Sequence, residues 1–205
     1  PVVPSTPAPL TAERLFREQF LPLYPAQART SAGLAELRAT DANPSNNPAI
    51  LRALDETADL FANLAPQALG VPSLTLDRTD ASIHRLSREL TPKARDRLFS
   101  SRRDASERRE PPLLIHFVAH AAVYVAACAV TNHGGSWLVR SPLWETRVAL
   151  VSKAGRAEIS PFAWLLRCLS DEGTSATLAD RYRTHVEVPF EDVERWPIVV
   201  EQIGR

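Results

Sequence analysis

The stretch that decides the fold runs from residue 113 to residue 135 and reads LLIHFVAHAAVYVAACAVTNHGG. Apart from histidine it contains no acidic or basic residue, and apolar side chains would cover nearly every side of a helix. A helix of this composition lies in a protein core or spans a membrane. We predict a helix over 113–131, which Asn132 and His133 close and which Gly134 ends by adopting the left-handed conformation.

Two features favour burial in protein over a membrane span. The stretch carries His116 and His120, and ionisable residues are rare in membrane spans. A second helix is predicted to begin at Asn47-Pro48 and to run to about Leu64, with one apolar face that can cover the first helix. The alternative is a membrane-associated protein with 113–131 as its span and the basic segment 102–109 on the cytoplasmic side.

The composition is that of a folded domain. Of 205 residues, 44% are apolar and 23% are charged, which is ordinary for globular proteins. We expect a Pro-rich leader at 1–10 and a single globular domain at 11–205. No targeting segment stands at the start, so we expect a cytoplasmic protein, although a signal peptide removed before Pro1 would leave the same pattern.

Short strands follow the central helix. Segments 136–140, 146–152 and one ending at Ile159 predict an antiparallel meander, and Ser160-Pro161 begins a helix with Phe162 and Trp164. Further helices are predicted at about 11–20, 31–38, 80–90, 92–99 and 174–184. The predicted fold class is therefore α+β, a mainly helical single domain with one buried central helix and a small antiparallel β meander.

Part of the chain, about residues 118–170, resembles a type of bacterial domain of unknown function. Its matching pieces are Tyr124, Gly134-Gly135-Ser136-Trp137 and Ser160-Pro161-Phe162-Ala163-Trp164. The chain departs from the pattern at Ala126 and Ala127, where the family carries glycine and glutamate. The resemblance implies a small α+β accessory or immunity-type module, and the departure removes the ionisable residue that a catalytic role would use.

The histidine pair is the sharpest candidate for chemistry. His116 and His120 lie one helical turn apart, a spacing that can place two imidazoles on one metal ion. Phe117 stands where a zinc-protease motif has glutamate, and a third ligand would have to come from His84, His185 or a carboxylate. We expect core or interface histidines and no metal or other cofactor. A metal-dependent hydrolase that uses His116 and His120 is the enzyme alternative.

The two cysteines offer a weaker candidate. Cys128 or Cys168 with His133 or His185 could pair a nucleophile with a base, but both cysteines lie in apolar runs. Apolar surroundings raise the pKa of a thiol and suppress the thiolate. The sequence also lacks a phosphate-binding glycine loop and a nucleophile elbow. We therefore predict no catalytic residue, and we expect the protein not to be an enzyme.

Charge gives no global argument for nucleic-acid binding, because 24 Lys and Arg balance 24 Asp and Glu. The densest positive stretch lies between Arg85 and Arg109. It could contact phosphates, but acidic residues interrupt it and aromatic residues for base stacking are scarce, so we expect a solvated face. The expected partner is another protein and not a nucleic acid.

We place the partner-binding surface on the meander, where an apolar anchor beside arginines has the composition of an interface. Our functional hypothesis is a non-enzymatic protein-interaction module of immunity, adaptor or secretion-accessory type, which uses the meander and the helix that flanks it. The oligomeric state stays open. The residues predicted to bind the partner are Trp137, Arg140, Leu143, Trp144 and Arg147.

Overall fold

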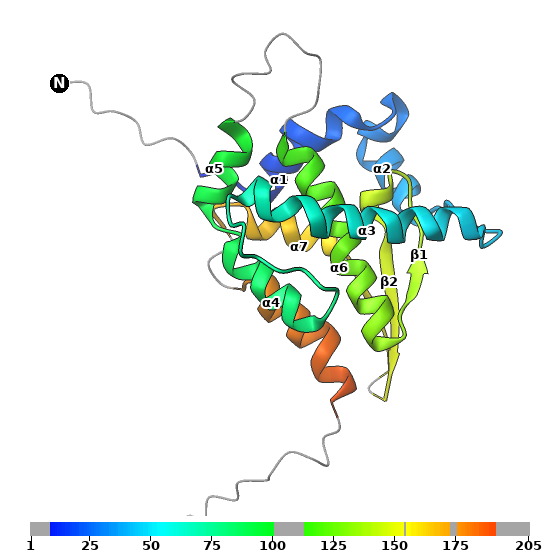
Figure 1. The fold of residues 1–205 in the computed structure, drawn as a ribbon. Coiled ribbons are helices and arrows are strands. Elements are labelled where there is room, and N and C mark those ends of the chain that lie inside the picture. Colours follow the sequence, from blue (N-terminus) through cyan, green and yellow to red (C-terminus); the bar gives the residue numbers. More distant parts are fainter. Residues whose placement is uncertain (1–8, 101–112, 154, 173–175, 192–205) are drawn as a thin grey trace, which may run out of the picture.

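The computed structural model describes residues 9–100, 113–153, 155–172 and 176–191. Helix α6 (Leu113–His133) crosses the middle of the molecule, and the other helices and the sheet surround it (Figure 1). Every residue from 121 to 129 is buried. By length and composition α6 could span a membrane, since its most apolar window has a mean hydropathy of 2.1. However, 72% of that window is buried inside the protein. The predicted buried central helix is confirmed.

The ends of α6 follow from its sequence. The helix runs two residues past the predicted end at Thr131, to His133. Gly134 then has a φ of +64°, which costs glycine little and other residues more. Gly135 must also be small, because a Cβ there would lie 2.5 Å from Val148 Cγ1. The chain can therefore turn directly from α6 into the sheet.

Helix α3 (Pro48–Leu69) packs along α6 and supplies the predicted apolar face. The Asn47 side chain caps its start by accepting from the Ala49 N–H, 2.9 Å away. Phe61 packs against Phe117 and Tyr124 of α6, with ring centroids 5.2 and 5.4 Å apart. The aromatic contacts fix the two longest helices against each other.

The predicted end of α3 at about Leu64 is wrong. The helix continues through Pro66 to Leu69, and Gly70 ends it with a φ of +67°. Proline removes one backbone hydrogen bond and strains the preceding turn. Ala65 and Leu69, which flank Pro66 beyond the predicted end at Leu64, are both buried, and their burial offsets that cost.

The remaining helices cover the other sides of α6. Helices α4 (Asp80–Glu89) and α5 (Pro92–Ser100) follow α3, and α7 (Pro161–Cys168) and α8 (Leu178–Tyr182) follow the sheet. At the start of the chain, α1 (Ala12–Leu15) continues into a π-helical turn (Phe16–Phe20) and two short 3₁₀ helices (Leu21–Leu23, Ala26–Arg29). Helix α2 (Ser31–Ala39) comes next, with Thr30 as its side-chain cap.

The sheet has three antiparallel strands in the order β1-β2-β3, which confirms the predicted meander. Strand β1 (Ser136–Leu138) is shorter than predicted, while β2 (Arg147–Ser152) and β3 (Gly155–Ile159) match their predicted segments. Trp137 lies opposite Val148, and Val148 lies opposite Ile159. Because side chains alternate along a strand, these three share the face that packs toward the core, and Arg147 points to the other face.

Candidate partner-binding cleft

The five predicted partner-binding residues do not form one surface. Trp137 and Arg147 belong to opposite faces of the sheet, since Trp137 pairs with Val148, the residue after Arg147. Trp137 packs against the core from the inner face. Leu143 is the most exposed large side chain of the five, at 41%. The structure thus separates an inner Trp137 from an outer Arg147.

Trp144 is engaged inside the protein. Its ring packs edge to face on Phe20 and Tyr24, with centroids 6.3 and 6.1 Å apart. Its indole N–H donates to the Tyr24 hydroxyl over 3.2 Å. Arg140 is also held, because its Nε donates to the Arg38 carbonyl oxygen over 2.8 Å. Both side chains fasten the loop after β1 to the N-terminal helices.

Glu145 is the central residue, or hub, of the contacts between this loop and the N-terminal helices. The sequence analysis did not identify it. The residue is only 3% exposed, in a 3₁₀ helix (Leu143–Glu145) between β1 and β2. Its Oε1 accepts from the Tyr24 hydroxyl at 2.5 Å and from Arg38 Nε at 2.9 Å and Nη2 at 2.6 Å. Burial, followed by the neighbouring Glu145 carboxylate, raises the pKa of Tyr24 far above its usual range. The Tyr24 hydroxyl is therefore the donor in this hydrogen bond, and the Glu145 oxygen is the acceptor.

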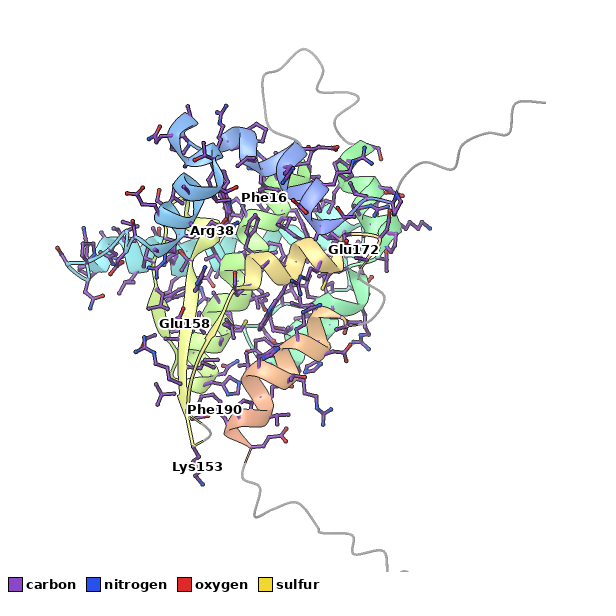
Figure 2. The ribbon with its side chains drawn as sticks, turned by 180° about the vertical axis from the view of Figure 1, so that it is seen from behind. Phe16, Arg38, Lys153, Glu158, Glu172 and Phe190 are labelled. Atoms are coloured by element: carbon purple, nitrogen blue, oxygen red, sulfur yellow. The ribbon has the colours of Figure 1, made fainter. Side chains whose placement is uncertain are left out.

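The Arg38 side chain connects the buried Glu145 with the protein surface. Its guanidinium carbon lies 5.0 Å from the centroid of the Phe16 ring, which Figure 2 shows beside it. Phe16 also packs edge to face on Tyr24 and Phe162. The arginine covers the one aromatic ring of the cleft described next, and its position is set by the buried Glu145.

A cleft of about 940 Å³ opens in front of Arg38, between the N-terminal helical turns, α2 and the outer face of the sheet. We call it the arginine cleft. Arg147, one of the five predicted residues, lines it from β2. The residues that line the arginine cleft are Glu13, Phe16, Arg17, Leu21, Arg29, Thr30, Ser31, Leu34, Ala35, Arg38, Ala39 and Arg147.

The arginines of the cleft differ in how they are paired. Arg17 contacts Glu13 at 2.7 Å, in an exposed i,i+4 pair of the kind that contributes little. Arg29 donates to two backbone carbonyls, from Nε to Tyr24 at 2.8 Å and from Nη2 to Pro22 at 2.7 Å. Arg147 has its nearest carboxylate at 3.7 Å, on Glu158 of β3, and its Nε is buried with no hydrogen-bond partner among the described residues. Positive charge is left over in the cleft.

The histidine pair lines a smaller apolar groove of about 220 Å³ between α3 and α6, with Leu60, Leu64 and Leu113. The ring centroids of His116 and His120 lie 6.3 Å apart, and His120 Nδ1 bonds to the His116 carbonyl oxygen at 2.6 Å. In the described part of the chain, no three His, Cys, Asp or Glu residues are grouped so that they could hold a metal ion.

The proposed third ligands have other contacts. His84 Nε2 pairs with Glu187 at 2.8 Å, and the His185 ring stacks on Trp164 with a centroid distance of 5.7 Å. Each of these histidines is therefore used by a neighbour other than the pair on α6.

A second polar cluster joins α4, α6 and α8. The Asp80 carboxylate accepts from Asn132 Nδ2 at 2.9 Å and from the Tyr182 hydroxyl at 2.8 Å, and it pairs with His133 Nε2 at 3.0 Å. The cluster borders a wide cleft of about 670 Å³ with Glu187, Phe190 and Glu191. The sequence analysis did not connect Asn132 and His133 with Asp80, because Asp80 lies more than 50 positions away along the chain.

The cysteines are unsuited to nucleophilic chemistry. Both are free thiols, Cys128 buried and Cys168 half-buried. Burial raises the pKa of Cys128 to about 12 and that of Cys168 to about 11. Both thiols therefore stay protonated near neutral pH, as their apolar sequence surroundings predicted.

Part of the predicted basic stretch, residues 101–109, lies outside the described residues. Comparison with known proteins gives no assignment: the chain matches no family model, no curated protein and no solved structure.

Proposed function

We propose that the protein binds another protein and catalyses no reaction on it, as a module of immunity, adaptor or secretion-accessory type. The surface that we propose is the arginine cleft, which lies between the N-terminal helical turns, α2 and strand β2 of the meander. We also propose that the protein belongs to the bacterial domain type that residues 118–170 resemble.

The observation that carries this proposal is the composition of the cleft. Arginines from β2, α2 and the N-terminal turns line the cleft together with the apolar side chains of Phe16, Leu21 and Leu34, which we call its apolar floor. Arginine and aromatic residues are enriched at protein interfaces, and an apolar centre with a polar rim is their usual layout.

The same composition favours binding over chemistry. General acid–base catalysis needs a side chain that can exchange a proton near neutral pH, most often histidine or a carboxylic acid. Among the described residues that line the cleft, only Glu13 carries a carboxylic acid, and it pairs with Arg17. Arginine stays charged at all ordinary pH values and serves as a fixed hydrogen-bond donor.

Two alternative functions, a metal-dependent hydrolase and a membrane-associated protein, are tested separately. A metal-dependent hydrolase would use His116 and His120, and elemental analysis of the purified protein tests it. A membrane-associated protein would use α6 as a span, and it would have to expose the helix that α3 and the sheet now cover. We prefer a cytoplasmic protein, in line with its two free thiols.

The proposal is tested by partner capture with the immobilised full chain. Arg147→Glu reverses one charge in the cleft, and Arg88→Glu reverses an exposed charge on α4 as the matched control. We expect Arg147→Glu to lose the partner and Arg88→Glu to retain it. A partner that is retained by Arg147→Glu and lost with Arg102→Glu and Arg103→Glu would move the interface to the basic stretch and reject our surface.

A further inference from the structure

The charges that line the arginine cleft indicate which kind of partner segment could bind there. Among the described residues, the lining holds four arginines and one glutamate, and that glutamate forms a salt bridge with Arg17. Arg38 is compensated from behind by Glu145. The other two arginines are paired less fully: among the described residues no carboxylate forms a salt bridge with Arg29, and Arg147 has only a long one, 3.7 Å to Glu158. The whole chain is electrically balanced, so this surplus is a local property of the cleft.

Arg29 is held in place before any partner arrives. Its two bonds to the carbonyl oxygens of Tyr24 and Pro22 fix the guanidinium without neutralising it. A guanidinium that is already fixed can bind a carboxylate with little further loss of side-chain entropy. Thr30 and Ser31, which follow it, place the N-terminus of α2 in the same lining, and the positive end of the helix dipole adds to the field.

Apolar side chains line the same cleft. Leu21 and Leu34 line the cleft beside Phe16. The Arg38 guanidinium covers one face of the Phe16 ring, and the rings of Tyr24 and Phe162 also pack against it, which disfavours the stacking of a nucleic-acid base. A bound segment would therefore place carboxylates on the arginines and aliphatic side chains on the floor.

We propose that the arginine cleft binds an acidic segment of a partner protein, one that carries glutamate or aspartate beside leucine-like side chains. This inference rests on the proposed function and names the chemistry of the partner. The acidic segment pairs with Arg29 and Arg147. Arg38 stays bound to Glu145 and holds the Phe16 ring of the apolar floor in position.

The test is fluorescence anisotropy of the full chain with three labelled probes: a short peptide of glutamates and leucines, the same peptide with glutamine for glutamate, and a single-stranded oligothymidine. We expect the glutamate peptide to bind at least about tenfold more tightly than the other two at low salt. Its affinity should fall as salt is raised, because salt screens exposed charges.

Variants then locate the site. Arg29→Gln with Arg147→Gln should weaken the glutamate peptide about tenfold, and Arg52→Gln with Arg88→Gln, two exposed arginines elsewhere, should leave it unchanged. Unaltered thermal unfolding of both double variants would show that neither affects the fold. Equal binding of the glutamate and glutamine peptides, tighter binding of the oligothymidine, or no loss with Arg29→Gln and Arg147→Gln overturns the inference. If capture of a natural partner still depends on Arg147 in that case, the proposed function stands and only the acidic chemistry is wrong.

Discussion

Arg38 and Glu145 lie 107 positions apart in the sequence and form a salt bridge of 2.6 Å in which the carboxylate is almost fully buried. This pair connects α2 to the loop between β1 and β2. Tyr24 bonds to the same oxygen, so three parts of the chain meet there. The pair thereby sets one wall of the arginine cleft.

Replacing Glu145 by glutamine should destabilise the protein by about 2–3 kcal/mol, because Arg38 loses its counter-charge and a buried acceptor of three hydrogen bonds is weakened. Urea unfolding measures the loss. Glu158→Gln is the matched control, since its contact with Arg147 is long and partly exposed, and it should cost less than about 0.5 kcal/mol. Equal costs for the two changes would show that Glu145 is not a hub.

Val125→Asp should unfold the domain. Val125 is fully buried in α6, where a new carboxylate would have no partner. The cost of several kcal/mol is comparable with the roughly 5–15 kcal/mol that stabilises a typical domain. Circular dichroism and solubility report the outcome, and a variant that keeps its melting temperature would place this face of α6 outside the core.

The two thiols should react slowly with a thiol reagent at about pH 8, because burial keeps the pKa of Cys128 near 12 and that of Cys168 near 11. A raised pKa lowers the thiolate fraction at every pH below it, so labelling should speed up on unfolding in denaturant. Absorbance after addition of the reagent gives the rate. Fast labelling of the native protein would reveal an accessible thiolate.

Purified protein should carry no stoichiometric zinc, iron or copper, and His116→Gln with His120→Gln should cost less than about 1 kcal/mol of stability. His116 is exposed and His120 is half-buried, so neither supports much packing. Elemental analysis and thermal unfolding check both statements. One metal ion per chain that the double variant loses would favour the hydrolase.

The central helix and the meander were predictable because each leaves a pattern within a short window. Residues 113–133 lack charged side chains other than histidine, and β2 and β3 match segments bounded by turn residues. The end of α3 was not predictable from local rules. Pro66 ends many helices, and here the burial of Ala65 and Leu69, a tertiary effect, overrides it.

The candidate site was predictable only in part. Arg147 could be found because it alternates with apolar residues in a strand. Glu145 could not, since a single glutamate in a loop looks like a surface residue, and its partner Tyr24 is 121 positions away. Asp80 and His133, 53 positions apart, were hidden for the same reason.

Site-specific photo-crosslinking tests the central claim, that a partner protein occupies the arginine cleft, most directly. A photoreactive amino acid replaces Ala35, an exposed residue of α2 that lines the cleft, or Glu56, an exposed residue of α3 outside it. In cells of the native host, we predict one cross-linked protein from position 35, lost when Arg147→Glu is added, and none from position 56. The same protein cross-linked equally from both positions, or from position 35 regardless of Arg147, would contradict the account.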